Sequence, residues 1–175
     1  MIYNEQDMKN IVLIGMPSSG KTSIGLLLAK RCGYGFIDSD LLIQNDQKAL
    51  LCDIIAREGA EGFIAIEERV NAELWAQRCI IATGGSVVYG DRAMRHLKEI
   101  GKVVYLKLDA GEVCRRIKNF TRRGVVMRGD VHTLTELYEE RAPLYEKYAD
   151  VTVDLSGKKF SEAVSLVKKA AGVRR

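Results

Sequence analysis

Residues 10–22 read NIVLIGMPSSGKT, and this stretch decides the architecture of the chain. The apolar run after Asn10 stops at Gly15, which is typical of a short strand buried in a sheet. Residues 15–22 then match the pattern G-x-x-x-x-G-K-[ST] in full. Glycines in such a loop let backbone N–H groups turn inward around an anion, and the next helix directs its positive end there. The stretch therefore predicts a strand, a phosphate-binding loop and a helix in succession.

The residues of this loop have separate expected roles. Lys21 should reach the β- and γ-phosphates of a nucleoside triphosphate, and the hydroxyl of Thr22 can ligate Mg²⁺. The alternative is a glycine-rich turn with a solvated lysine, but the position between a strand and a helix favours nucleotide binding. We expect the following loop residues to bind ATP: Gly15, Ser18, Ser19, Gly20, Lys21, Thr22 and Ser23.

Strands and helices alternate along the rest of the sequence. Apolar runs predict further strands at 35–40, 79–85, 102–109 and 150–155. Helical spacing predicts helices at 23–33, 51–77, 92–100, 111–119, 134–148 and 160–172, with breaks near Gly59 and Gly62 and a kink or division at Pro143. Alternating elements of this kind predict a three-layer α/β/α fold with a five-stranded parallel sheet. We expect one domain over residues 1–175, with a lid at about 119–132.

Composition narrows the class of protein. The net charge of +4 is spread along the chain without an aromatic-interleaved basic motif, so we expect no nucleic-acid partner. The four cysteines are far apart and the two histidines lie in unrelated contexts, which disfavours disulfides and a histidine-built metal site. The polar N-terminus is no secretory signal and no stretch is apolar enough to span a membrane. We therefore expect a cytoplasmic protein, and a monomer.

Two acids follow the second predicted strand, in FIDSD. If the chain stays extended there, Asp38 and Asp40 point into one crevice while Ser39 points away. One carboxylate can hold metal-bound water, and the other can orient or deprotonate a substrate hydroxyl. The alternative is that Asp40 only caps the next helix.

The phosphate loop is also compatible with a switch or motor NTPase, in which Asp109 would hold the metal. The early acids and the basic segment at 119–130 favour a small-molecule kinase instead.

At this point the chain resembles the shikimate kinases. GMPSSGKTSIG, FIDSD, IIATGG, an arginine in a lid segment and ERAPLYEKYAD occur in that family's order and spacing, over residues 9–170. The resemblance implies a P-loop fold of the nucleoside-monophosphate-kinase type with a mobile lid. It also implies transfer of the γ-phosphoryl group of ATP, with Mg²⁺, to a ring hydroxyl of shikimate, an acceptor that carries a carboxylate.

The resemblance also implies roles for individual residues. Asp40 matches the aspartate on the acceptor hydroxyl, and Asp38 matches the one near the metal, beside Thr22. Gly84 and Gly85 match glycines whose N–H groups contact the acceptor. Three arginines match as well. Arg123 matches the lid residue that approaches the phosphates, Arg116 matches an arginine that packs on adenine, and Arg141 matches an arginine that binds the acceptor carboxylate.

Two of these arginines also stand out from their sequence context. Leu137 lies four residues before Arg141 and Tyr145 four after it, so Arg141 falls on an apolar helix stripe and needs an anionic partner. An internal salt bridge or a snorkelling side chain is the alternative. Arg123 lies in a segment without clear periodicity. An arginine on a closing lid can stabilise charge on the transferred phosphoryl group. The alternative is that Arg123 is an ordinary arginine in a surface loop.

The sequence departs from the family pattern in three places. The family's F-R-x-x-E segment reads Phe63-Ile64-Ala65-Ile66-Glu67, so Ile64 stands where an arginine contacts the acceptor carboxylate. The glycine triplet ends in Ser86, which is a mild change, and Gly124 replaces a lid proline, which should loosen the lid. Losing one charged hydrogen bond predicts roughly 10- to 150-fold weaker carboxylate binding. Arg57 on the preceding helix is a candidate substitute.

Ile64 therefore leaves more than one function open. Shikimate phosphorylation is the leading hypothesis. The second is a kinase of the same fold that acts on another hydroxy acid, an amino alcohol or a polyol, with Ile64 against an apolar part of it. A non-catalytic binding module of this fold is the third, and the retained catalytic set of Lys21, Asp40 and Arg123 counts against it.

Overall fold

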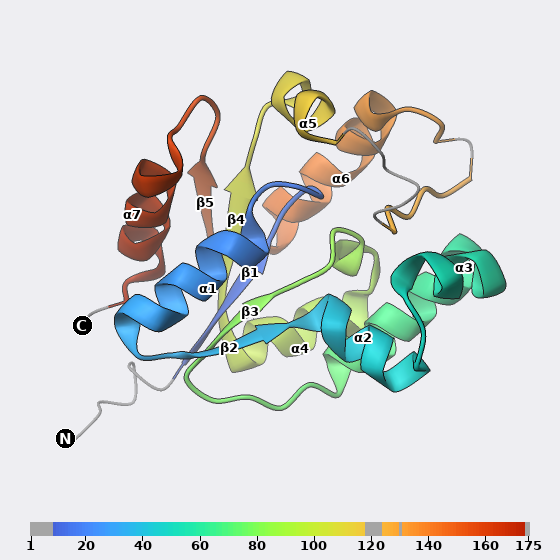
Figure 1. Ribbon diagram of the computed structural model, residues 1–175, viewed down its shortest axis with the longest axis horizontal. Helices are drawn as coiled ribbons and strands as arrows, with labels where there is room; N and C mark the ends of the chain where they lie inside the picture. Colours follow the sequence, from blue (N-terminus) through green and yellow to red (C-terminus); the bar gives the residue numbers. More distant parts are fainter. Residues whose placement is uncertain (1–8, 118–123, 130, 174–175) are drawn as a thin grey trace.

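The computed structural model describes residues 9–117, 124–129 and 131–173, and its strands form one parallel sheet in the order β2-β3-β1-β4-β5 (Figure 1). The strands are β1 (Asn10–Ile14), β2 (Gly35–Asp38), β3 (Cys79–Ala82), β4 (Gly101–Lys107) and β5 (Val151–Asp154). Strand β1 is central, with Val12 paired to Ile81 of β3 and to Val103 of β4. The five-stranded parallel sheet predicted from the apolar runs is confirmed.

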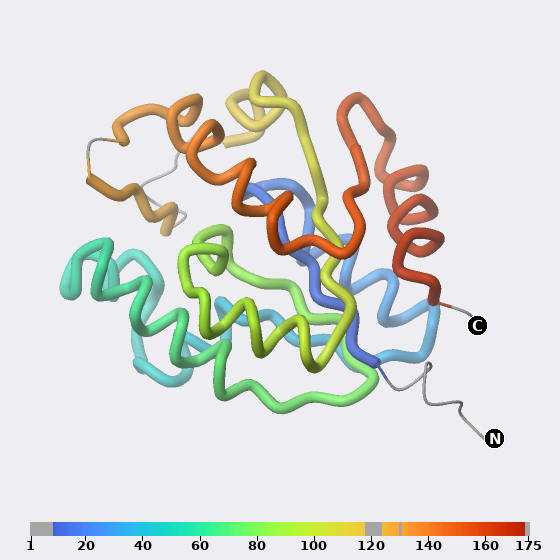
Figure 2. The backbone as a smooth tube through the Cα atoms, turned by 180° about the vertical axis from the view of Figure 1, so that it is seen from behind, coloured from blue at the N-terminus to red at the C-terminus, as the bar shows by residue number. Residues whose placement is uncertain are grey.

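Helices cover both faces of this sheet. Helices α1 (Lys21–Cys32) and α7 (Phe160–Ala171) lie on the face nearer the viewer in Figure 1, and α4 (Asp91–Ile100) and α6 (Leu134–Tyr148) lie on the other (Figure 2). Helices α2 (Ser39–Gln47) and α3 (Leu51–Ala72) pack against each other at the β2 edge, and α5 (Ala110–Arg116) follows β4. None of the helices in the described ranges is long and apolar enough to cross a bilayer.

The core explains why the strands read as uninterrupted apolar runs. Every residue of β1 is buried, as are Ile80 and Ile81 of β3, because helices pack on both sides of the sheet. A second, smaller apolar cluster, separate from the main core, is formed by residues of α2 and α3 together with one residue of the 124–129 segment. It consists of Ile43, Ile54, Phe63, Ile64 and Val126.

Four details differ from the sequence expectation. The helix predicted over 51–77 ends at Ala72, because Leu74 and Ala76 leave the helix to bury their side chains in the main core. Its break lies at Gly59 alone, where φ is 69° and ψ is −179°, and Gly62 is helical. Pro143 does not divide α6, which runs unbroken from Leu134 and begins with a capping box. A short 3₁₀ helix, Val87–Tyr89, was not predicted.

A buried asparagine joins the strands at the end of the sheet opposite the phosphate loop. Asn10, 1% exposed, donates its Nδ2 protons to the carbonyl oxygens of Ala76 (2.7 Å) and Ile100 (2.9 Å). Its Oδ1 accepts a hydrogen bond from the N–H of Cys79 at 2.9 Å. One side chain thus fixes where β3 and β4 begin relative to β1.

We predict that Asn10→Ala lowers the free energy of unfolding by about 2–4 kcal/mol, because it leaves buried backbone groups without partners. Urea denaturation measures the loss. The control is Asn45→Ala on the exposed side of α2, which should change stability by no more than about 0.5 kcal/mol. Equal stabilities for the two variants would contradict the structural role of Asn10.

Candidate active site

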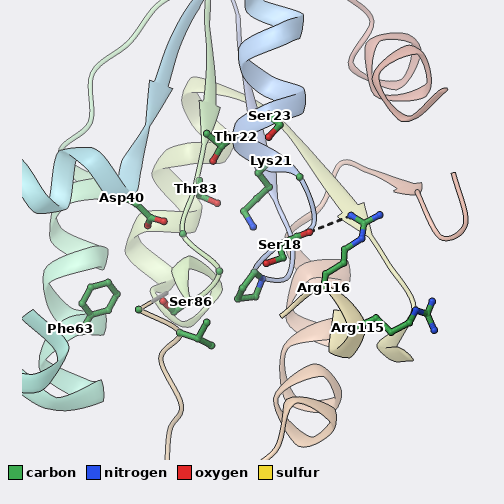
Figure 3. A pocket seen from close by; sticks show the side chains of 16 residues that line it. Ser18, Lys21, Thr22, Ser23, Asp40, Phe63, Thr83, Ser86, Arg115 and Arg116 are labelled. Carbon is green, nitrogen blue, oxygen red and sulfur yellow. Dashed lines mark hydrogen bonds between the residues drawn. The ribbon is translucent and has the colours of Figure 1, made fainter. Parts of the chain in front are cut away.

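A cavity of about 740 Å³ opens at the carboxyl ends of β1, β2 and β3 (Figure 3). Parallel α/β sheets bind ligands at this edge, because their loops converge there. The phosphate loop and the start of α1 line one side, the segment after β3 lines another, and α2 and α3 add one residue each. The lining includes Pro17, Ser18, Gly20, Lys21, Thr22, Ser23, Asp40, Phe63, Thr83, Gly84, Gly85 and Ser86.

The phosphate loop curls tightly at the end of β1. Gly15 has a φ of 147°, and a Cβ there would lie 2.6 Å from the carbonyl oxygen of Leu106 on β4. The N–H of Ser19 closes the turn by donating to the carbonyl of Met16 at 3.1 Å. Only glycine fits at position 15, because its φ is positive and the neighbouring strand is in contact.

Lys21 lies at the centre of this loop and is buried. Its Nζ donates to the carbonyl oxygens of Gly15 (2.7 Å) and Met16 (2.9 Å). Burial lowers the pKa of Lys21 to about 8, and the nearby Asp40 carboxylate opposes the shift. The ammonium is therefore a cation held beside the cavity by loop carbonyls, where phosphate oxygens can reach it.

Thr22 and Asp38 lie together at the mouth of the loop. The Thr22 hydroxyl donates to Asp38 Oδ2 at 2.9 Å, and Asp38 Oδ1 accepts from the N–H of Asp40 at 3.1 Å. Mg²⁺ prefers hard oxygen ligands of these two kinds, together with water and phosphate oxygens. The donor set thus fits the metal position expected for the pair.

Asp40 is the acid that faces the cavity (Figure 3). Burial raises the pKa of Asp40 to about 6; the carboxylate of Asp38 adds to the rise and Lys21 opposes it. The expectation of an extended segment here is wrong, because Asp38 is the N-cap and α2 begins at Ser39. Ser39 is fully buried, and its Oγ accepts the N–H of Gly84 at 3.2 Å, so it braces the site.

The glycine segment after β3 lies between the acids and α6. A Cβ at Gly84 would lie 2.2 Å from Glu67 Oε1 and 2.7 Å from Asp40 Oδ1, so no side chain fits there. The Gly84 N–H is already bonded to Ser39, and the Gly85 carbonyl accepts from the Tyr145 hydroxyl at 2.5 Å. Both glycines line the cavity, but in this structure the Gly84 N–H is directed within the protein.

Arg141 points inward from α6, as its place on the apolar stripe predicted, and is 1% exposed. Its Nη2 donates to the Val126 carbonyl at 2.6 Å and its Nε to the Tyr89 hydroxyl at 3.1 Å. A Cβ at Gly85 would lie 3.1 Å from Arg141 Nη1, so the guanidinium reaches the rim of the cavity. Its hydrogen-bond partners among the described residues are neutral oxygens, which leaves its charge available to an anion nearby.

Position 64 contributes no polar group. Ile64 is 9% exposed and packs in the small apolar cluster with Phe63 and Val126, away from the lining of the cavity. The suggestion that Arg57 replaces the missing arginine is not supported, because its side chain is exposed and paired with Glu58 at 2.6 Å.

The nucleotide side carries two more arginines, Arg115 and Arg116 at the end of α5, opposite Asp40 in Figure 3. Arg116 Nη1 donates to the carbonyl of Ser18 at 3.3 Å, and its Nη2 pairs with Glu112. Arg123, assigned to the lid, lies outside the described residues. Gly124 and Val125, which follow it in the segment expected to form a lid, line the cavity.

Several residues of the site were not predicted. Phe63, Thr83 and Val125 line the cavity, and Glu67 is buried behind Gly84. Thr83 also donates to the Leu13 carbonyl at 3.0 Å, which ties its loop to β1. Glu67 could have been found from the sequence, because the glutamate of the F-R-x-x-E pattern is retained while its arginine is not.

Known proteins match both the sequence and the structure. The family model for shikimate kinase matches residues 17–171. A shikimate kinase of Thiobacillus denitrificans is 39% identical over 147 residues, 83% of this chain and 80% of that protein. One from Thermodesulfovibrio yellowstonii is 38% identical over 152 residues, 86% and 87% of the two chains.

Among solved structures, shikimate kinase from Acinetobacter baumannii in complex with shikimate superposes with a TM-score of 0.79. It is 30% identical, and the match covers 93% of this chain and 90% of that one. The P-loop α/β fold is thereby confirmed over nearly the whole chain.

We predict that Asp40 titrates near pH 6 in the ligand-free protein, because burial and Asp38 both disfavour its charged form. Carboxyl carbon NMR measures this titration, with Asp40→Asn identifying the signal. Asp38→Asn keeps a helix cap but removes a neighbouring charge, so it should lower the Asp40 pKa. An Asp40 that titrates at its ordinary value would mean that the site is solvated rather than buried.

Proposed function

The chain belongs to the shikimate kinase family, and from this premise we propose that it transfers the γ-phosphoryl group of ATP to a ring hydroxyl of shikimate, giving ADP and shikimate 3-phosphate. The reaction belongs to aromatic amino-acid biosynthesis. The observation that carries the proposal is the placement of Asp40 and Lys21 in one cavity, where an acid for the hydroxyl faces a cation for the phosphates.

The phosphate side of the cavity binds and orients ATP. We propose that Lys21 contacts the β- and γ-phosphates, while backbone N–H groups of the loop and the positive end of α1 bind the remaining oxygens. Thr22 and Asp38 would hold Mg²⁺, which, when bound, neutralises charge on the phosphates. Arg116 is suitably placed beside Ser18 to pack against the adenine base.

The acceptor side positions a hydroxyl for attack. Asp40 accepts the proton of this hydroxyl as its oxygen bonds to the γ-phosphorus, and the bond from that phosphorus to the oxygen of ADP breaks. Asp40 must be ionised for this role, so activity should fall as the pH drops through about 6. Arg141 would bind the carboxylate at the other end of the acceptor.

A second acceptor class is favoured by one observation, the apolar packing of Ile64 in place of an arginine. A kinase of the same fold that phosphorylates another hydroxy acid, an amino alcohol or a polyol would need less positive charge at this position. It would keep Lys21, Thr22 and Asp40 and differ only in the acceptor pocket.

We further propose that the chain is a single domain that acts as a monomer in the cytoplasm, without a nucleic-acid partner. The four cysteines are free, which suits a reducing compartment. Sedimentation of the purified protein tests the oligomeric state.

Shikimate should give saturable, ATP-dependent ADP release in a coupled assay over a panel of hydroxylated acceptors. Asp40→Asn should lower kcat by about 10²- to 10⁴-fold, the usual contribution of a positioned base, and leave nucleotide affinity unchanged. Turnover of another acceptor with none of shikimate would contradict the leading proposal and favour the second class. ATP binding without transfer to any acceptor would contradict both.

The adjacent arginines of the lid offer a matched pair of variants. Arg123→Ala should lower kcat by about 100-fold or more, because a lid arginine stabilises charge on the transferred group. Arg122→Ala removes the same charge one residue away and should leave kcat within a few-fold. Equal losses in the two variants would show that general positive charge, rather than Arg123, is what the reaction needs.

A further inference from the structure

The site contains a buried carboxylate that the proposed reaction does not use. Glu67 on α3 is 1% exposed, and neither of its carboxylate oxygens has a partner at hydrogen-bonding geometry among the described residues. Its Oε1 and the Oδ1 of Asp40 both lie within 2.7 Å of the position that a Gly84 Cβ would take. Two carboxylates therefore approach the same point beside the cavity.

Helix α3 supplies no cation beside Glu67, because position 64 is an isoleucine. The two residues lie three apart on α3, so their side chains share a face of the helix. An arginine at 64, as in the family pattern, would stand next to the Glu67 carboxylate. Ile64 instead packs into the small apolar cluster with Val126, and Glu67 has no positive partner on its own helix.

Among the described residues, five groups on other elements lie near enough to act on Glu67, and they leave its negative charge poorly compensated. They are Asp40 of α2, Lys21 of α1, Arg141 and Tyr145 of α6, and the hydroxyl of Ser86. Lys21 and Arg141 attract the Glu67 carboxylate, but both already donate to backbone carbonyls. Ser86 lies near enough to lower the pKa of Glu67, but not at hydrogen-bonding geometry. Burial outweighs these effects, and with Asp40 it raises the pKa of Glu67 to about 8.

We propose that a proton on Glu67 replaces the positive charge that an arginine at position 64 would supply, so that an anionic acceptor binds only while Glu67 is neutral. In the proposed complex the positive charge of Lys21 is already matched by Asp40 and the ATP phosphates, and that of Arg141 by the acceptor carboxylate. An ionised Glu67 would add an unmatched negative charge in a desolvated site, which is costly. A neutral carboxylic acid can instead donate a hydrogen bond to an acceptor oxygen.

This inference rests on the proposed function and makes Glu67 a specificity residue for anionic acceptors. The fraction of protonated Glu67 falls as the pH rises through about 8, so affinity for shikimate should be highest below that pH and decline above it. A cationic acceptor would show the opposite trend, because it would be attracted by the ionised carboxylate.

The test is the shikimate KM, measured at saturating MgATP from about pH 6.5 to about pH 9.5. Saturation matters because Lys21 also titrates near pH 8 in the free protein, and bound phosphates raise its pKa out of this range. KM should be constant below about pH 8 and rise by up to about tenfold per pH unit above it, while kcat stays level.

Three variants separate Glu67 from other titrating groups. Glu67→Gln is neutral at every pH, so its KM should be flat and close to the wild-type value at low pH. Ile64→Arg supplies the missing cation, and its KM should also be flat. Ile64→Val keeps the apolar environment and should retain the wild-type rise, as the matched control. A Glu67→Gln variant with the full wild-type rise would overturn the proposal.

Calorimetry gives a readout that does not depend on turnover. Shikimate binding in buffers of different ionisation heat should show uptake of about half a proton per site near pH 8, and none for Glu67→Gln. Shikimate turnover with a pH-independent KM and no proton uptake would contradict this inference alone. No shikimate turnover or binding at any pH would contradict the proposed function, and the inference with it.

Discussion

A lysine ammonium buried at the end of the central strand is the constraint on which the active site depends. Lys21 is compensated by the carbonyl oxygens of Gly15 and Met16, and these reach it only because the loop curls at Gly15 against β4. A buried cation requires such partners. The sheet then brings Asp40 to the same cavity, and the opposite charges of Lys21 and Asp40 moderate the effect of burial on each other.

The acceptor half of the site is built differently from the phosphate half. Two of its departures from the family pattern have identifiable neighbours, because Ile64 packs in one apolar cluster with Val126 and Ser86 lies near Glu67. The Val126 carbonyl accepts from Arg141, and Arg128 of the same segment pairs with Glu61 of α3 at 2.8 Å. We therefore expect a change at position 64 to affect both the packing of Val126 and the protonation of Glu67.

The sequence predicts the fold well for a physical reason. Strands buried on both faces read as apolar runs, and the phosphate loop requires a strand before it and a helix after it. The inward direction of Arg141 was likewise predictable from helical spacing. Prediction failed where tertiary contacts decide the local structure. Ser39 begins a helix instead of extending the strand, and its buried hydroxyl accepts a hydrogen bond from the Gly84 N–H. At residues 73–78 the burial of Leu74 ends the helix early. The state of Glu67 depends on neighbours from three other helices, which no local pattern records.

The central claim is that Asp40 and Arg141 bind opposite ends of one acceptor while Lys21 holds the phosphates. The most direct measurement is a crystal structure with Mg²⁺, a non-hydrolysable ATP analogue and shikimate. We predict a ring hydroxyl about 2.6–3.2 Å from an Asp40 carboxylate oxygen, in line with the γ-phosphate, and the acceptor carboxylate on the Arg141 guanidinium. Shikimate bound with its carboxylate turned away from Arg141, or with no hydroxyl near Asp40, would contradict the account.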